Sequence, residues 1–148
     1  MIVTSEIKSK RLLALLERVG AIAVSREGLD ESRCEVSLIL VSAEEMRELN
    51  ARYRGKNEPT DVLSFPMFEN IVTPGSGEAP VILGDVAICR EIAEKQAAEI
   101  GQSAEKEIVY LFVHSMLHLL GYNHENEDDK GKMREAEEEI LKELGEIN

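Results

Sequence analysis

The segment SAEKEIVYLFVHSMLHLLGYNH, residues 103–124, predicts one long helix and a turn directly after it. Apolar residues occur on most sides of this helix between Ser103 and Leu120. A helix that is apolar on nearly all sides is normally buried inside its domain. We therefore expect it to be the central helix, with these side chains in the core: Ile108, Val109, Leu111, Phe112, Val113, Met116, Leu117, Leu119 and Leu120.

Further helices and strands are predicted on the N-terminal side of this segment. Apolar residues at helical spacing predict a helix over residues 4–20 that ends at Gly20. Ser42 and Glu45 form a capping-box pattern, which predicts a helix that starts there and ends near Gly55. Runs of apolar residues, many of them β-branched, predict strands at residues 34–41, 62–67 and 81–89.

The remaining segments complete a mixed fold. Pro66 indicates that the strand at 62–67 lies at a sheet edge or near its own end. Residues 90–101 and 128–145 have the spacing of helices, and residues 69–80 have the composition of a loop. Together these elements predict an α+β fold with α/β character. We expect a single domain over residues 1–148, in which a small sheet of three or four strands packs with about five helices.

The composition is that of a soluble globular protein, with 43% hydrophobic and 31% charged residues. Cys34 and Cys89 are too few for a disulfide framework and lie in apolar runs, so we expect buried thiols. No secretory signal and no apolar run of ~18 residues are visible, which favours the cytoplasm. The net charge of −12 counts against a basic nucleic-acid binder, although residues 125–148 alone carry ten acidic and four basic residues.

All three histidines of the chain lie within residues 114–124, in the pattern H-x-x-x-H-x-x-G-x-x-H. His114 and His118 are four residues apart and therefore lie on the same side of the predicted helix. Gly121 can take the left-handed conformation that ends a helix, so the following turn can bring His124 to the same point. Three imidazoles with an open fourth position are typical of a catalytic zinc site. We expect these three histidines to bind one Zn²⁺ ion.

The same histidine spacing occurs in the metzincin proteases, with one difference. Those enzymes have a glutamate directly after the first histidine, where it acts as the general base. Ser115 occupies that position in this chain and cannot accept a proton as a carboxylate does. The sequence therefore predicts a metal site without the base that a peptidase of this class needs.

Three segments resemble the motifs of the YbeY family, the bacterial rRNA maturation factors. HSMLHLLGYNH (114–124) is similar to the zinc motif of that family. LNARYRGKNEPTDVLSF (49–65) and LGDVAIC (83–89) are similar to its second and third signatures. The motifs occur in the family's order, and the similarity extends over roughly residues 40–130.

The resemblance implies a zinc-dependent, single-strand-specific endoribonuclease that acts in 3′-end maturation of 16S ribosomal RNA and in late ribosome quality control. It implies a cytoplasmic protein whose partners are ribosomal RNA, proteins of the small ribosomal subunit and an assembly GTPase. It implies that His114, His118 and His124 bind the zinc ion and that Arg54 lies beside the active site. Asn123 replaces an aspartate that the family usually has; it can orient a neighbour but cannot take a proton.

The catalytic residues beyond the histidines are less firmly indicated. Arg54 is a candidate to bind phosphate through its planar guanidinium, although a position near a helix end also suits a solvated charge. Asp61 and Asp85 are candidates to orient a histidine, Asp85 could pair with Arg54, and Asp61 fits a turn equally well. The general base stays open.

Two other functions stay open at this stage. One is a non-enzymatic ribosome-assembly factor in which zinc mainly stabilises the fold. The other is a different metallohydrolase, either a minimal peptidase or a small phosphoesterase. Loss of folding on metal removal would favour the first, and peptide cleavage would favour a peptidase.

Overall fold

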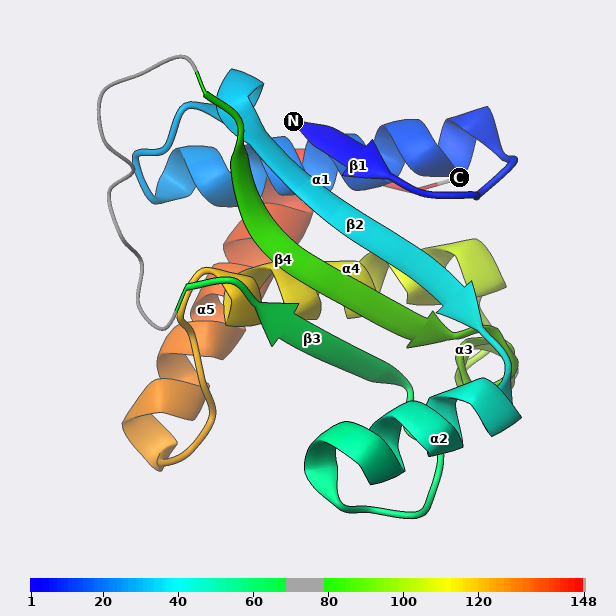
Figure 1. Cartoon of the computed structure of the whole chain (residues 1–148). Coiled ribbons are helices and arrows are strands. Elements are labelled where there is room, and N and C mark those ends of the chain that lie inside the picture. Colours follow the sequence, from blue (N-terminus) through cyan, green and yellow to red (C-terminus); the bar gives the residue numbers. More distant parts are fainter. Residues whose placement is uncertain (69–78, 148) are drawn as a thin grey trace.

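The computed structural model describes residues 1–68 and 79–147. Within these residues it has a four-stranded sheet in the order β1-β2-β4-β3 and five α-helices, which is the predicted α+β class (Figure 1). The strands are β1 (Ile2–Thr4), β2 (Cys34–Val41), β3 (Val62–Pro66) and β4 (Val81–Cys89). The helices are α1 (Lys10–Arg26), α2 (Ala43–Arg54), α3 (Arg90–Glu99), α4 (Ala104–Leu119) and α5 (Glu127–Leu144), with a 3₁₀ turn at Glu31–Arg33.

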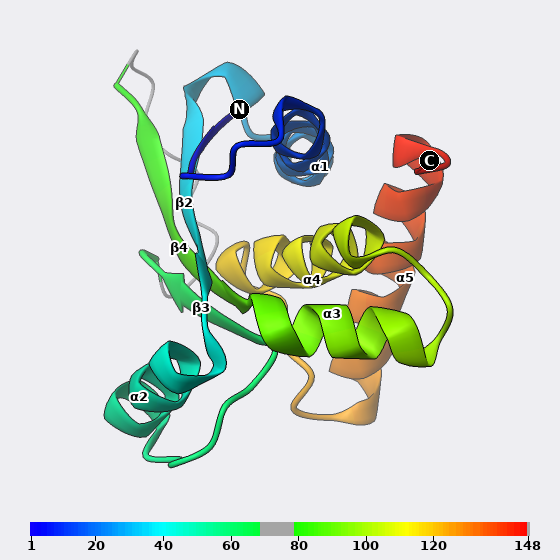
Figure 2. The same cartoon turned by 90° about the vertical axis from the view of Figure 1, so that its right-hand side faces the viewer.

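The sheet separates two layers of unequal size (Figure 2). Helices α1, α3, α4 and α5 lie on one side of it, and α2 lies on the other. Strands β1, β2 and β4 run parallel, whereas β3 pairs with β4 in the antiparallel direction and forms an edge. The edge position of β3 confirms the prediction from Pro66, because an edge strand tolerates a residue without a backbone N–H.

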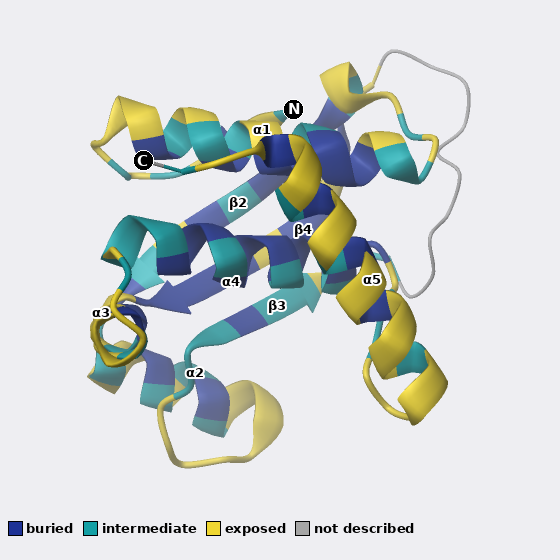
Figure 3. Ribbon diagram, turned by 180° about the vertical axis from the view of Figure 1, so that it is seen from behind, coloured by how far each residue is buried: buried dark blue, intermediate teal, exposed yellow. Residues whose placement is uncertain are grey.

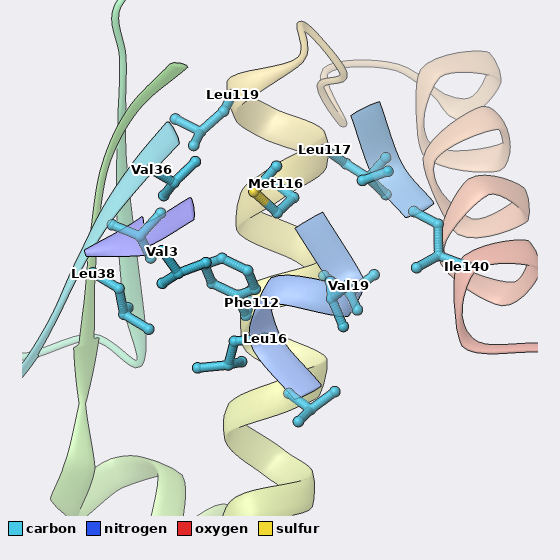
Figure 4. Close-up of a cluster of buried hydrophobic side chains, with 14 of the residues drawn as sticks. Val3, Leu16, Val19, Val36, Leu38, Phe112, Met116, Leu117, Leu119 and Ile140 are labelled. Carbon is cyan, nitrogen blue, oxygen red and sulfur yellow. The ribbon is translucent and has the colours of Figure 1, made fainter. Parts of the chain in front are cut away.

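Helix α4 is the centre of the core, as its sequence predicts. It contacts α1, α3, α5, β3 and β4, and buried residues follow one another along most of its length (Figure 3). Phe112 and Met116 point toward the sheet, where Val36 is one of their neighbours, whereas Leu117 points toward Ile140 of α5 (Figure 4). Burying each such side chain contributes about 1.5–3 kcal/mol, so α4 supplies a large part of the stability.

The first helix begins and ends later than predicted. Helix α1 starts at Lys10, after Ser9, whose side chain accepts a hydrogen bond from the N–H of Leu12. Gly20 lies inside this helix rather than after its end, so that prediction is wrong. A Cβ atom at Gly20 would lie 2.7 Å from Cγ of Met1. The glycine therefore leaves room for Met1, the residue directly before β1. The strand β1 was not predicted from the sequence.

Several shorter-range predictions are confirmed. Ser42 and Glu45 form the capping box at the start of α2, and Gly55 ends this helix with a φ of 68°. Cys34 and Cys89 are buried free thiols, and burial raises the pKa of Cys34.

No helix in the described part of the chain is long and apolar enough to cross a membrane. The loop expected over residues 69–80 falls almost entirely outside the described residues.

Gly84 allows β4 to pack closely against its neighbours. The pairing of β2 with β4 shifts in register between Glu35 and Val36, opposite this glycine, whose φ is +150°. A Cβ atom at Gly84 would lie 2.3 Å from the backbone oxygen of Phe65 in β3 and 2.9 Å from Cδ2 of Leu119 in α4. The absence of a side chain therefore lets β3 and the C-terminal end of α4 approach each other.

We predict that Gly84→Ala lowers the free energy of unfolding by about 2–4 kcal/mol, because both the strained backbone and the overlap with β3 must be relieved. Gly131→Ala is the matched control, since Gly131 lies inside α5 with open space around its Cβ position. Alanine is favoured there by about 0.5–1 kcal/mol through helix propensity. Urea unfolding measures both variants, and equal stability of the two would contradict the close packing at Gly84.

Candidate metal centre

The C-terminal end of α4 is closed by the turn that its glycine predicts. Leu120 is the C-cap residue of α4, and Gly121 follows it with a φ of 100°. The N–H of Gly121 donates to the carbonyl oxygen of His118 at 3.1 Å, and the N–H of Tyr122 donates to that of Leu117 at 2.9 Å. These two bonds define a Schellman motif, which reverses the chain after a helix. The predicted role of Gly121 is confirmed.

This turn brings three imidazole rings together. The Nε2 atoms of His114 and His118 are 3.1 Å apart. The ring centroid of His124 lies 5.9 Å from that of His114 and 5.1 Å from that of His118. One ligand nitrogen from each ring lies within 4.8 Å of the other two, so the three side chains could hold one metal ion. His114 and His118 are partly buried and His124 is exposed.

A hydrogen bond orients His118 for this purpose. Its Nδ1 lies 3.0 Å from the backbone oxygen of Tyr122, so we assign the proton to Nδ1. Its Nε2 is then free to face His114. Burial, followed by the neighbouring His114, lowers the pKa of His118 below its usual value of 6.5. Both effects favour the neutral ring, which is the form that binds a metal ion.

Tyr122 fixes the turn to the first and last helices. Its hydroxyl is hydrogen-bonded to Glu27 and Arg26 at the C-terminal end of α1. Arg26 in turn forms an ion pair with Glu139 of α5. Burial, followed by the bond to Glu27, raises the pKa of Tyr122. The turn that leads to His124 is therefore anchored to α1 and, through Arg26, to α5.

Asn123 supports the same turn through its side chain. Its Oδ1 accepts a hydrogen bond from the N–H of Glu125 at 3.2 Å, which closes the backbone around His124. Asn126 then caps α5 by accepting a bond from the N–H of Asp129 at 2.9 Å. The orienting role expected of Asn123 is thus directed at the backbone on either side of His124.

The three imidazoles lie in a cleft of about 760 Å³. Residues far away in the sequence also line it, among them Arg54 at the end of α2, Asp61, and Ser64 of β3. Phe68 and Tyr122 also line it. The cleft therefore combines possible metal ligands, an arginine and two aromatic residues.

The segment between α2 and β3 is held firmly beside this cleft. Asn50 is buried, and its Nδ2 donates to the carbonyl oxygen of Glu58 at 2.7 Å. Oδ2 of Asp61 accepts a bond from Nε2 of Gln96 at 3.4 Å, and its backbone oxygen accepts one from the N–H of Cys89 at 2.8 Å. These bonds fix the wall that Asp61 and the neighbouring helix end contribute.

Some residues singled out in the sequence lie elsewhere. Asp85 is exposed on the opposite face of the sheet, where it lines a separate pocket with Tyr53 and Phe65. The prediction that Asp85 orients a histidine or pairs with Arg54 is therefore wrong. The register shift before it turns its side chain outward, and an exposed carboxylate needs no buried partner.

Ser115 points into the core rather than into the cleft. Its side chain is fully buried, at 0% exposure, and it is absent from the described lining of the cleft. The Ser115 hydroxyl is therefore not among the groups that line the space beside the three imidazoles. This geometry agrees with the sequence argument that the peptidase base is missing.

Glu137, an acidic residue of α5 that lies beside the candidate metal centre, was not identified from the sequence. Oε1 of Glu137 in α5 lies 3.7 Å from Nδ1 of His114. Helical spacing could have identified it, because Met133, Ala136 and Ile140 form the buried face of α5 and position 137 lies at the edge of that face. An acid at such a position lies toward the protein rather than toward solvent.

Comparison with known proteins identifies the family. The family model described as endoribonuclease YbeY matches residues 2–145. A protein named endoribonuclease YbeY from Desulforamulus reducens is 45% identical over 136 residues, covering 92% of this chain and 88% of the relative. Its namesake from Pelotomaculum thermopropionicum is 47% identical over 130 residues, covering 88% and 84%. The solution structure of TM1509 from Thermotoga maritima matches with a TM-score of 0.66 at 34% identity, over 97% of this chain and 89% of that one. The chain therefore belongs to the endoribonuclease YbeY family.

Proposed function

We propose that this protein is a zinc-dependent endoribonuclease that cleaves single-stranded RNA in the cleft beside α4. One observation carries the proposal: three imidazoles converge in a cleft that Arg54 also lines. The relatives named endoribonuclease YbeY support an RNA substrate. All 148 residues would form the single catalytic domain.

The donor set fits zinc. The described cluster offers three imidazole nitrogens without a thiolate or a carboxylate, and imidazole is a common zinc ligand. His114, His118 and His124 would hold the ion and leave a fourth position open, as catalytic zinc sites do. A bound zinc ion would supply the Lewis-acid chemistry that activates water for attack on phosphorus.

The remaining cleft residues suit a single-stranded polyanion. Arg54 would bind a phosphate group, since its planar guanidinium can donate to two phosphate oxygens at once. Phe68 and Tyr122 offer aromatic surfaces in the same cleft, on which unpaired bases could stack. Asn123 would keep His124 in position and would not transfer a proton.

The proposed biological role follows from the family. We propose a cytoplasmic protein that acts in 3′-end maturation of 16S ribosomal RNA and in late ribosome quality control. Its partners would be ribosomal RNA, small-subunit proteins and an assembly GTPase. We expect these partners to help the protein bind its RNA substrate. The net charge of −12 supports this expectation, because an acidic protein gains little from general electrostatic attraction to RNA.

We predict that His118→Ala removes the bound zinc and lowers the rate of RNA cleavage by more than about 100-fold. Removing a residue that only supports a metal ligand already lowers metal affinity or activity by about 10–100-fold, and the loss of a ligand should have a larger effect. Elemental analysis of untagged protein and cleavage of a single-stranded RNA, both on one preparation, test this. One equivalent of zinc in the wild type, with equal cleavage by both proteins, would point to a contaminating nuclease. It would also favour the non-enzymatic assembly factor.

We predict that Arg54→Ala lowers kcat/KM for RNA by about 10–100-fold, because a hydrogen bond to a charged group contributes about 1.5–3 kcal/mol. The zinc content should not change. Arg52→Ala is the control, since Arg52 is an exposed arginine of the same helix that does not line the described cleft. If the two variants lose the same activity, Arg54 contributes only general charge.

We predict that zinc binding weakens steeply as the pH falls from about 7.5 to about 5.5, because protons compete with the metal for neutral imidazoles. The pKa of His118 lies below 6.5 in the folded protein. In the metal-free protein, the contribution of His118 to the free energy of unfolding should therefore be complete above about pH 6.5. This contribution should be lost as the pH falls through the lowered pKa of His118. Equilibrium dialysis with zinc measures the first effect and thermal unfolding the second. A zinc affinity independent of pH would contradict histidine coordination.

A further inference from the structure

We propose that Glu137 of α5 is a positioning residue for the metal centre. Its carboxylate would accept the Nδ1–H of His114 and so determine which nitrogen of that ring faces the metal ion. The inference rests on the proposed metal-binding function and assigns a role to a residue outside the three sequence motifs. It concerns a group on the last helix that is absent from the described lining of the cleft.

The two nitrogens of His114 have different surroundings. Nε2 lies 3.1 Å from Nε2 of His118 and therefore points into the cluster. Nδ1, on the other side of the ring, lies 3.7 Å from Oε1 of Glu137. This distance is within ion-pair range and longer than the ~2.7–3.2 Å of a direct N–H···O bond. The negative charge nevertheless favours a proton on Nδ1, which leaves the Nε2 lone pair for the metal.

His118 shows the same arrangement with a different acceptor. Its Nδ1 is satisfied by the backbone oxygen of Tyr122 at 3.0 Å, while its Nε2 faces His114. Both helical histidines thus have an oxygen behind the ring and Nε2 in front. Metal-bound histidines usually have such a partner, which fixes the orientation of the ring. For His114 that partner is a side chain, which a substitution can remove.

The rest of α5 holds the carboxylate in place. Met133, Ala136 and Ile140 are buried against the core, and Glu139 is paired with Arg26 of α1. The side chain of Glu137 is 32% exposed and that of His114 is 33% exposed, so both are partly shielded from solvent. Glu137 is absent from the described lining of the cleft. It therefore lies behind the histidine and acts through it.

Zinc affinity of the full-length, metal-stripped protein tests the proposal, measured by competition with a chromogenic chelator. We expect Glu137→Gln to raise the Kd for Zn²⁺ about tenfold, within the range known for such partners. Glu138→Gln is the matched control, because it removes the same charge from an exposed neighbour in the same helix. Glu137→Asp keeps the charge and should restore part of the affinity. Equal Kd values for Glu137→Gln and Glu138→Gln would overturn the proposal.

A second measurement separates this inference from the proposed function. Nitrogen-15 NMR of the zinc-bound protein reports which ring nitrogen of His114 binds the metal and which one carries the proton. We expect zinc on Nε2 and the proton on Nδ1 in the wild type and in Glu138→Gln, and a mixture of both ring orientations in Glu137→Gln. An unchanged orientation in Glu137→Gln would overturn the role of Glu137 even if zinc binds. Absence of zinc binding in the wild type would instead overturn the proposed function, together with the part of this inference that concerns the metal.

Discussion

The burial of α4 between the sheet and the other helices is the constraint on which the rest of the structure depends. Apolar side chains leave this helix in several directions, toward the sheet through Phe112 and Met116 and toward α5 through Leu117. A helix fixed on so many sides cannot slide or rotate without exposing apolar surface. The packing therefore fixes the position of the C-terminal end of α4 relative to β3 and β4. It also fixes the positions of His114 and His118, which lie at that end.

The cleft forms where two unrelated parts of the chain meet at the edge strand. One part is the end of α4 with its turn, and the other is the segment from Arg54 to β3. Antiparallel pairing of β3 with β4 brings the second part to the first, because α4 packs against both strands. Gly84 makes this approach possible by leaving out a side chain where β4, β3 and Leu119 meet.

The features predicted correctly from the sequence depend on neighbouring residues. The burial of α4, the capping box of α2 and the turn at Gly121 follow from patterns a few residues long. The features predicted wrongly depend on distant packing. Gly20 lies inside α1, where Met1 packs against it. The direction of Asp85 depends on a register shift between strands, and the position of Glu137, which was missed, depends on how α5 docks beside α4. Helical spacing places Glu137 at the edge of the buried face of α5, but short-range patterns do not contain the strand register or the docking of one helix beside another.

The positions of the site residues along the chain have a consequence for folding. The three histidines belong to one helix and the turn after it, so closing this small loop costs little entropy. The cleft, in contrast, requires segments about sixty residues apart, such as those of Arg54 and His114, to come together, and such long-range arrangements form slowly. A partly folded or damaged molecule can therefore keep a competent metal-binding segment after its cleft is lost. Metal content reports on that segment and on the docking of α5, which carries Glu137, whereas cleavage of RNA reports on the whole tertiary structure.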